Sequence, residues 1–316
     1  MKIGLDVMGG DFAPDATIDG AILAREALDV RDEIVLIGQA DIIKKHLEKI
    51  GLPVDTFKIV NAEEIVGMAE KPLKALTHKP DSSISAGFRM LKSRQIQGFC
   101  SAGNSGAMVV GAMYSVGTIT GVIRPTTTAH VPQENGAESI ILDIGTSPDT
   151  KPDVLYQFAL LGSIYCQEIL KINNPRVGLL NIGVEEGKGN LLCQSAYQMM
   201  KDSTDFNFTG NVESRDLFKD KADVIVCDGF TGNIVLKQIE AMYRMLQKRN
   251  LVDDFFSRFN YENYGGSPVL GVNGNVVIGH GISSAIAIKN MIVLTHQIHC
   301  GRVTNKIRRA LHNFSR

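Results

Sequence analysis

The chain has 316 residues, a formal net charge of −1 at pH 7 and no tryptophan. This length suits one large α/β domain or two lobes. The nearly balanced charge and the few aromatic residues exclude a typical nucleic-acid-binding protein, which needs a basic surface or aromatic platforms on which bases stack.

The cysteine and histidine residues predict neither a metal site nor a disulfide framework. The five cysteines are scattered, and none forms a Cys-x-x-Cys pair. His296 and His299 suit one face of a helix, but no acidic third ligand accompanies them. We therefore expect no metal and no cofactor, and free thiols fit a reducing cytoplasm. Met1 and Lys2 lead directly into an apolar run without a signal peptide, which also favours a cytoplasmic location.

Short apolar runs alternate with amphipathic segments along the chain. The runs are almost continuously apolar, as expected for parallel strands covered on both faces. The expected strands are 2–7, 33–38, 57–61, 98–102, 139–145, 176–183, 206–210 and 223–229. The expected helices are 16–28, 40–50, 83–94, 105–116, 153–170 and 233–249. This alternation predicts a doubly wound, mostly parallel α/β/α sandwich.

The segment 98–123 carries no charge over a length that could span a bilayer. Near its start, however, Ser101, Gly103 and Asn104 form a polar turn. We expect a strand, this turn and a buried helix of small residues in place of a membrane span.

Polar, glycine-rich loops follow five of the expected strands. The ligand crevice of an open α/β sheet lies at the carboxyl ends of its strands, so these loops are expected to converge on one rim. Asp or Asn before Gly is also an ordinary turn or helix cap, but five such loops favour a site. The candidate residues in them are Asp6, Gly9, Gly10, Asp11, Ser101, Gly103, Asn104, Ser105, Gly106, Asp143, Lys151, Asn181, Lys188, Asp228, Gly229 and Asn233.

The loop in LLNIGVEEGKGN, residues 179–190, indicates what kind of ligand this rim would hold. It is not a nucleotide-phosphate loop, because Gly183 and Gly187 are separated by three residues where that motif needs four, and Gly189 follows Lys188 in place of Ser or Thr. Helix starts in this rim would offer free N–H groups to an anion, and Lys151 and Lys188 would add positive charge. The residues predict a site for a small anion or anionic group; a solvated turn with a charged tip is the alternative for this loop.

A series of blocks, in this order, resembles the bacterial fatty-acid/phospholipid synthesis family of PlsX-type phosphate acyltransferases. The resemblance runs from Met1 to about Lys289. No block decides alone, but a long block such as 222–237 is specific when it is in register with the others. The blocks are LDVMGGD (5–11), SAGNSGAM (101–108), GVIRP (121–125), LDIG (142–145), KPDVLYQFALLG (151–162), GLLNIGVEEGKGN (178–190), GNVESRD (210–216), ADVIVCDGFTGNIVLK (222–237) and YGGSPVLGVNGNVVIGHG (264–281).

The resemblance implies that long-chain acyl-[acyl carrier protein] and inorganic phosphate give acyl phosphate and free acyl carrier protein. Phosphate is itself the nucleophile in this reaction, which agrees with the lack of a Gly-x-Ser-x-Gly motif. The resemblance also implies a fold similar to the isocitrate/isopropylmalate dehydrogenase and phosphotransacetylase group, usually as a homodimer. The acyl phosphate would supply a membrane glycerol-3-phosphate acyltransferase in phospholipid synthesis.

Hypothetical roles for the candidate residues follow from that reaction. Lys188 would neutralise phosphate, and Asp6 or Asp228 would orient it or accept its proton. The expected phosphate-binding groups are those of Ser101, Gly103, Asn104, Ser105 and Gly106. The groups expected to polarise the thioester carbonyl are Asn181, Asn233 or His280. Turn or cap roles for Asp6, Asp228 and His280, and a solvated position for Lys188, are the alternatives.

We expect a single phosphate acyltransferase domain over 1–316. A division of this domain into two lobes, with the cleft formed by the strand-end loops, is the alternative. The segment 238–263 is shorter than the helical hairpin common in the family, and its amphipathic pattern fits peripheral membrane contact, a partner subunit or core packing. The basic tail 296–316 is expected to be a helix that receives the acidic carrier protein or has a solvated face.

Other functions stay open. One is a phosphotransacetylase-like enzyme that uses a short acyl-CoA. Another is a non-catalytic scaffold for lipid-synthesis enzymes at the membrane. A dehydrogenase of the same fold group is less favoured, because no Gly-x-Gly-x-x-Gly follows a strand.

Overall fold

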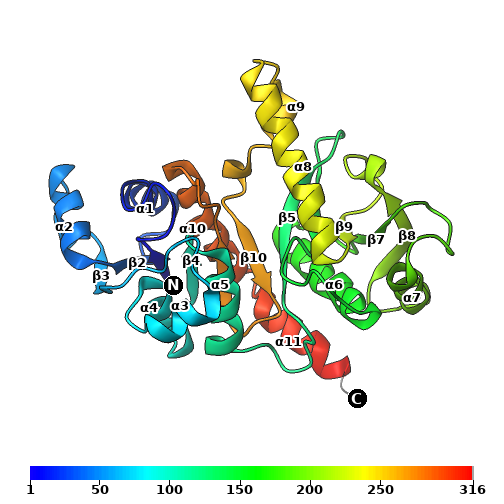
Figure 1. Ribbon diagram of the computed structural model, residues 1–316, viewed down its shortest axis with the longest axis horizontal. Coiled ribbons are helices and arrows are strands. Elements are labelled where there is room, and N and C mark those ends of the chain that lie inside the picture. Colours follow the sequence, from blue (N-terminus) through cyan, green and yellow to red (C-terminus); the bar gives the residue numbers. More distant parts are fainter. Residues whose placement is uncertain (315–316) are drawn as a thin grey trace. The chain divides into compact units, whose positions relative to one another are not determined.

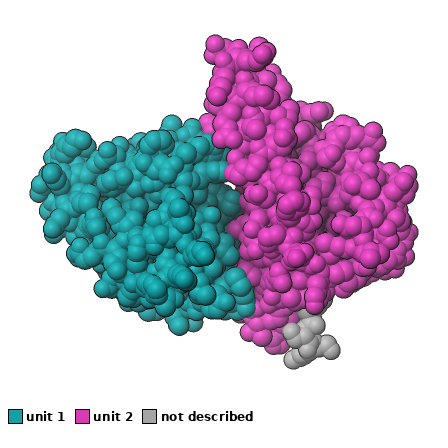
Figure 2. Space-filling view, viewed as in Figure 1, with its two compact units in different colours: residues 1–118, 261–300 teal, residues 119–260, 301–316 magenta. Residues whose placement is uncertain are grey.

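The computed structural model describes residues 1–314. It divides into two compact units (Figure 2): unit 1 comprises residues 1–118 and 261–300, and unit 2 comprises residues 119–260 and the chain from 301 onward. Each unit has a mostly parallel set of strands with helices, labelled in Figure 1. The predicted α/β fold class is therefore confirmed.

The strands of unit 1 lie in the order β3-β2-β1-β4-β11-β10. β10 is antiparallel to β11, and the other neighbours are parallel. The runs predicted near the N-terminus form β1 to β4, whereas β10 and β11 are four-residue strands in a glycine-rich stretch that did not predict them. The bounds are Lys2–Asp6 (β1), Glu33–Gly38 (β2), Lys58–Asn61 (β3), Gly98–Ser101 (β4), Ser267–Leu270 (β10) and Asn275–Ile278 (β11).

Helices cover both faces of the unit 1 sheet. Successive residues of a strand point to opposite faces. Gly98 of β4 faces Thr295 of α10, while the next residue, Phe99, packs on Phe88 of α4. α10 also packs along α1. The bounds are Asp15–Ala27 (α1), Ala40–Lys49 (α2), Pro72–His78 (α3), Ser83–Lys92 (α4), Ser105–Gly111 (α5, continued by a π-helical turn over Ala112–Val116) and Ala285–Cys300 (α10).

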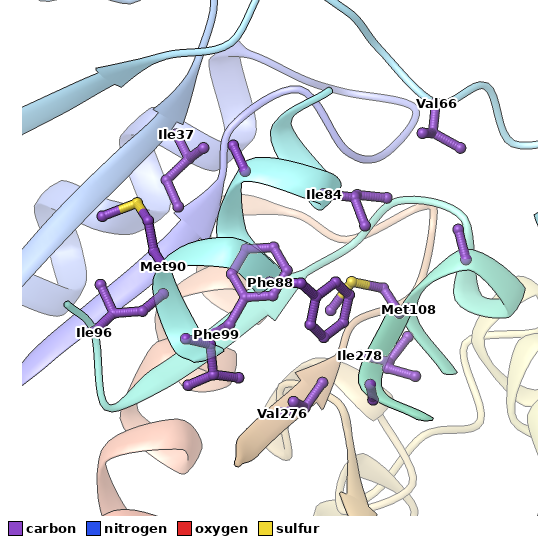
Figure 3. Packing of buried hydrophobic residues seen from close by; sticks show 14 of the residues in the cluster. Ile37, Val66, Ile84, Phe88, Met90, Ile96, Phe99, Met108, Val276 and Ile278 are labelled. Atoms are coloured by element: carbon purple, nitrogen blue, oxygen red, sulfur yellow. The ribbon is translucent and has the colours of Figure 1, made fainter. Parts of the chain in front are cut away.

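The core between α4, α5 and the sheet is centred on two aromatic rings (Figure 3). Phe88 and Phe99 meet edge to face with their ring centroids 5.1 Å apart. A Cβ on Gly87 would overlap the ring of Phe99, and one on Gly111 would overlap the ring of Phe88. Glycine at these positions allows the helices to approach the aromatic side chains closely.

The strands of unit 2 lie in the order β5-β6-β9-β7-β8. β5 and β6 are antiparallel, and the other neighbours are parallel. The predicted strands at 139–145, 176–183, 206–210 and 223–229 correspond to β6, β7, β8 and β9. The bounds are Thr126–Pro132 (β5), Glu138–Leu142 (β6), Arg176–Asn181 (β7), Asn207–Glu213 (β8) and Val224–Val226 (β9).

Alternate residues of these strands face different helices. Gly162 of α6 lies against Leu142 and Val224. Ile141, the neighbour of Leu142, belongs to a buried cluster against which Val235 of α8 packs. The bounds are Pro152–Tyr165 (α6, continued by a π-helical turn over Cys166–Leu170), Leu191–Met200 (α7), Gly229–Lys248 (α8), Asp254–Ser257 (α9) and Val303–Phe314 (α11), with short 3₁₀ turns at Ser214–Asp216 and, in unit 1, Tyr261–Asn263.

Two expectations about helices have definite outcomes. The single helix expected over 296–316 is wrong within the described residues, because α10 ends at Cys300 and α11 begins at Val303. Arg302 between them has a left-handed φ of 54°, which ends a right-handed helix; residues 315–316 lie outside the described part. The segment 98–123 starts with β4, a turn and α5 as expected, and no helix within residues 1–314 is long and apolar enough to cross a membrane.

Each unit contains one point where the strand order reverses. In unit 1, β2 lies on one side of β1 and β4 on the other; in unit 2, β8 lies on one side of β7 and β9 on the other. The loops that leave the carboxyl ends of such a strand pair diverge to opposite faces of the sheet, which opens a crevice there. Most of the candidate residues selected from the sequence lie at these two switch points.

Candidate functional site

A buried carboxylate occupies the switch point of unit 1. Asp6 ends β1, is 1% exposed and accepts a 2.6 Å hydrogen bond from the hydroxyl of Ser101 at the end of β4. The amide of Met8 donates to its other oxygen at 3.0 Å, and the amide of Gly103 donates to Ser101 Oγ at 2.9 Å. The structure therefore brings together Asp6, Ser101 and Gly103, which the sequence had separated by almost a hundred residues.

Burial raises the pKa of the Asp6 carboxyl above its ordinary value, against hydrogen bonds from Ser101 and Met8 that lower it. A carboxyl group whose pKa is raised by burial at a strand end is a candidate proton acceptor. The predicted role of Asp6 thus has a physical basis beyond that of a turn residue.

The loop after β1 passes very close to the loop after β4. A Cβ on Gly9 would lie 2.5 Å from Asp6 Oδ2 and 2.6 Å from the amide nitrogen of Gly103. Gly10 has a φ of +111°, which L side chains rarely adopt. The exposed Asp11 is tied by its backbone amide to the carbonyl of Gly281 at 2.7 Å.

Three further candidates of unit 1 lie at the start of α5. Asn104 is 5% exposed; its Oδ1 accepts from the amide of Ala107 and its Nδ2 donates to the carbonyls of Gly67, Met68 and Glu70 at 2.9–3.1 Å. Its side chain thus caps α5 and holds the 67–70 loop. Ser105 is exposed, and a Cβ on Gly106 would lie 2.5 Å from Pro72 Cγ. Phosphate binding by these residues stays a prediction.

His280 follows β11 and packs against Tyr261, with ring centroids 4.6 Å apart and the ring planes tilted by 46°. Three residues later, the Ser283 hydroxyl is buried, with no hydrogen-bond partner within the described chain. Such a group costs about 1–3 kcal/mol if it stays unsatisfied. Sequence reasoning missed Ser283, because its only signal was its proximity to the Gly-His-Gly block.

In unit 2, two asparagines fix the loop that follows β7. Asn181 donates from Nδ2 to the carbonyl of Lys188 and to Asn211 Oδ1, both at 3.1 Å, and accepts from the amide of Ile182 at 2.8 Å. Asn211 donates to the carbonyl of Glu185 at 2.9 Å. Gly189 has a φ of +88° and leaves no room for a Cβ beside the Asn181 side chain. The loop 182–190 is therefore held at both ends.

Lys188 is the cation of this loop. Its side chain is exposed and, like that of Lys151, makes no ion pair or side-chain hydrogen bond to residues 1–314. Glu186 instead pairs with Lys201 at 2.9 Å and accepts from Gln198 at 2.6 Å, so its charge is neutralised beside α7. A fixed loop thus presents an ammonium group that is available for an anion.

Asp143 and Asp228 both act on the backbone around them. Asp143 is fully buried and accepts from the amides of Thr146 and Ser147 at 3.1 and 2.6 Å. Asp228 caps α8, with its oxygens accepting from the amide and hydroxyl of Thr231 at 2.9 and 2.7 Å. These contacts support the cap alternative for Asp228; its role as a proton acceptor stays a prediction.

The start of α8 is packed directly on the turn after β6. Gly229 donates from its amide to the carbonyl of Ser147 at 2.9 Å, and a Cβ there would lie 2.8 Å from Asp143 Oδ2. Asn233 is exposed on the second turn of α8, near Gly145. Its amide is therefore accessible for the predicted contact with a carbonyl oxygen.

A cavity of about 420 Å³ lies at the switch point of unit 2. Asn181 and Asp228 line it, and the sequence had selected both. It had not selected Cys193, Thr231 and Val235, which also line it, because single residues inside amphipathic helices carry no motif signal.

The candidate residues thus form one group in each unit, at or next to the carboxyl ends of strands. The convergence of both groups on a single rim stays a prediction. Within residues 1–314, no set of three or more His, Cys, Asp or Glu side chains has a geometry that could hold a metal ion.

A family model described as fatty acid synthesis protein matches residues 1–255. A phosphate acyltransferase of Dictyoglomus turgidum is 40% identical over 334 aligned residues, which cover 100% of this chain and 99% of that relative. The chain belongs to the fatty acid synthesis protein family. The family and the kind of enzyme predicted from the motif blocks, a phosphate acyltransferase, are confirmed.

Solved structures agree with the fold of this chain. A phosphotransacetylase from Streptococcus pyogenes superposes with a TM-score of 0.66 at 18% identity, covering 95% of this chain and 94% of the other. A branched-chain phosphotransacylase from Enterococcus faecalis superposes with a TM-score of 0.62 at 12% identity, covering 95% and 99%. At these identities the similarity shows the fold alone. The match to the family model contains both switch points and every candidate residue except His280.

Proposed function

We propose that this phosphate acyltransferase transfers the acyl group of a long-chain acyl-[acyl carrier protein] to inorganic phosphate. Transfer to phosphate is supported by the phosphate acyltransferase of D. turgidum, which is 40% identical over the whole chain. The carrier protein as donor and the long chain rest on the resemblance of the motif blocks.

In the proposed reaction, a phosphate oxygen attacks the carbonyl carbon of the thioester. The tetrahedral intermediate collapses with cleavage of the C–S bond, and the carrier protein leaves as a thiolate. A thiol with a pKa of about 8.5 leaves without strong help from a general acid. The protein must therefore position phosphate, neutralise its charge and stabilise the oxyanion, and none of these tasks needs a nucleophilic side chain.

The observation that carries the proposal at the level of the site is Lys188. Its ammonium group is exposed and unpaired within residues 1–314, on a loop that Asn181 and Asn211 hold in place. We assign it to the phosphate. The accessible amide of Asn233, on the second turn of α8, suits the thioester carbonyl.

Unit 1 supplies a second set of proposed roles. Asp6, with its raised pKa, and Ser101, which donates to it, would orient phosphate or accept its proton.

We also propose that the chain acts as a cytoplasmic homodimer whose product supplies a membrane glycerol-3-phosphate acyltransferase. Exposed apolar side chains support peripheral contact of the 238–263 segment with a membrane. Met242, Met245 and Leu251 are 48%, 58% and 57% exposed.

The test is the release of carrier-protein thiol from palmitoyl-[acyl carrier protein] as a function of phosphate concentration. Lys188→Ala should lower kcat/KM for phosphate by roughly 10²- to 10³-fold, the usual effect of losing one electrostatic contact to a transition state. Lys188→Arg, which keeps the charge, should retain more activity than Lys188→Ala. Lys221→Ala is the matched control, because it removes an exposed lysine of the same unit outside the loop.

The outcomes separate the alternatives. Wild-type turnover that does not depend on phosphate, or a kcat/KM for phosphate unchanged in Lys188→Ala, would refute the assignment of Lys188. A preference for acetyl-CoA over palmitoyl-[acyl carrier protein] would favour the phosphotransacetylase-like alternative. A folded wild type with no turnover on either donor would favour the scaffold.

A further inference from the structure

The proposed reaction assigns no part of its substrates to the cavity of unit 2. Its volume of about 420 Å³ lies in the range of small-molecule binding pockets. It lies beyond the ends of β7 and β9, between the starts of α7 and α8. Its lining residues are Leu155, Leu179, Leu180, Asn181, Ile182, Gly189, Asn190, Cys193, Ser214, Cys227, Asp228, Thr231 and Val235.

The interior of this cavity is apolar. Leu155, Leu179 and Val235 come from α6, β7 and α8 and present aliphatic side chains to it. Cys193 and Cys227 add two thiols whose pKa values are raised, mainly by burial and also by nearby Asp228, so that both behave as small neutral groups.

Four polar side chains of the lining, Asn181, Asn190, Asp228 and Thr231, are already engaged with the protein. Asn181 holds the loop after β7, and Asn190 accepts from the amide of Cys193 at 2.9 Å as the cap of α7. Both oxygens of Asp228 accept from Thr231. Each cap thus occupies one backbone amide at the start of its helix, Cys193 in α7 and Thr231 in α8.

The charge of the cavity disfavours phosphate in its interior. Within the described chain, its lining contains the acid Asp228 but no lysine, arginine or histidine. A multiply charged anion would meet a carboxylate and no counter-charge. Lys188 lies next to the lining residue Gly189, and its carbonyl accepts from Asn181. An exposed cation and the lining of an apolar cavity thus belong to the same loop.

We propose that this cavity receives the part of the acyl chain next to the thioester carbonyl. This inference rests on the proposed function and adds to it the place of the chain. A phosphate oxygen held by Lys188 and a chain held in the cavity would both be presented by the loop 182–190, with the thioester carbonyl between them. The cavity makes chain length a determinant of catalytic efficiency, since each methylene group moved from water into it changes affinity by about fourfold.

The first test fills the cavity from α8. Val235→Phe places a ring where the chain would lie. It should lower kcat/KM for palmitoyl-[acyl carrier protein] by about tenfold or more, the effect of excluding two methylene groups, and leave acetyl-[acyl carrier protein], which has no methylene group to exclude, within about twofold. The KM for phosphate should not change.

The control is Ile234→Phe, the same change one residue earlier on α8, at a side chain that is 52% exposed and outside the lining. It should leave both donors unchanged. Equal losses for the long and short chains in Val235→Phe, or no loss for either, would overturn the proposal.

The second test needs no turnover. In a Cys300→Ser background, which removes the exposed thiol, Cys193 is the one cysteine of the described chain that is not fully buried. Its alkylation rate should fall in the presence of decanoate and not in the presence of inorganic phosphate. Denatured protein should be alkylated equally with and without decanoate.

Alkylation of Cys193 that decanoate does not slow, at concentrations that inhibit turnover of palmitoyl-[acyl carrier protein], would overturn the proposal while the proposed function stands. Loss of phosphate-dependent turnover in the wild type would instead refute the proposed function, because protection of Cys193 does not depend on catalysis.

Discussion

At the scale of a single residue, burial of the Asp6 carboxylate destabilises the folded state. Its carboxyl is 1% exposed, and burial raises its pKa above the ordinary value of 3.8. The folded state therefore binds the Asp6 proton more tightly than the unfolded state does. The ionised carboxylate destabilises the fold at a pH above the raised pKa, and this effect disappears as the pH falls below the unfolded value.

We predict that the Tm of Asp6→Asn minus the Tm of the wild type will increase as the pH rises from about 4 to 7. The lower end of this range is set by the pKa of a carboxyl group in the unfolded chain. The amide keeps the shape of the carboxyl and removes its ionisation. Thermal unfolding of both proteins across this pH range measures the difference. A difference that stays constant with pH would show that the ionisation of Asp6 does not contribute.

At the scale of elements, Asn104 joins a helix to a distant loop. Its oxygen caps α5 while its nitrogen donates to three carbonyls of the 67–70 loop. A cap alone tolerates Asp as well as Asn. A donor to carbonyls does not, because a carboxylate would repel them.

We predict that Asn104→Ala and Asn104→Asp will both lower the free energy of unfolding, by about 1–3 kcal/mol for the alanine variant, which loses the cap and leaves acceptors unpaired. Both should also accelerate proteolysis near residues 67–70. Urea unfolding and limited proteolysis are the measurements. Full rescue by Asp would mean that Asn104 is only a cap.

The contact between α8 and the turn after β6 depends on glycine. A Cβ on Gly232 would overlap the carbonyl oxygen of Asp143, whereas a Cβ on Gly187 would meet nothing within 4 Å. We predict that Gly232→Ala costs about 1–3 kcal/mol of stability, as overpacking usually does, and that Gly187→Ala stays within about 0.5 kcal/mol of the wild type, as surface changes do. Chemical denaturation compares the two. Equal effects would show that the backbone contact can relax.

At the scale of the whole molecule, the chain holds two units that each contain a buried cluster of their own. Phe88 lies in the cluster of unit 1, where it is 1% exposed and meets Phe99 edge to face. Removing such a ring leaves a cavity that the surroundings fill only in part.

We predict that Phe88→Ala lowers the free energy of unfolding of unit 1 by about 3–5 kcal/mol. Hydrogen exchange should then accelerate in β1, β4 and α5 and stay unchanged in β6, β7 and β9, because local stability follows the core that is damaged. Mass spectrometry of exchanged peptides measures this. Acceleration of equal size in both units would show that they unfold as one.

The strands that the sequence predicted are those with long, continuous apolar runs, such as β2 and β7. Of the strands that it did not predict, β5 and β10 contain threonines or a proline that interrupt the pattern, and β11 has only four residues between Gly274 and Gly279. The break between α10 and α11 was also missed, because it depends on the left-handed φ of Arg302. This conformation is uncommon for a non-glycine residue, so the residue type does not predict it.

Among the candidate residues, Lys188 could be selected from the sequence of its loop alone. The sequence could not predict whether its ammonium group pairs with a neighbouring carboxylate. Glu185 and Glu186 are neighbours of Lys188 in sequence, yet Glu186 pairs with Lys201 at the end of α7. Asn104 and Asp228 looked like ligands in a glycine-rich motif, and only their contacts show that they hold backbone.

The sequence by itself determined the fold class, the family and the strand-end loops, because apolar periodicity and motif blocks are local properties that survive without coordinates. Only the tertiary structure decided which polar groups are free and where an apolar cavity lies. Asp6 and Ser101 meet through the strand order of unit 1, and the cavity exists because β7 and β9 lie side by side with helices that start from their ends. Such juxtapositions depend on chain topology, which brings together residues that no sequence window contains.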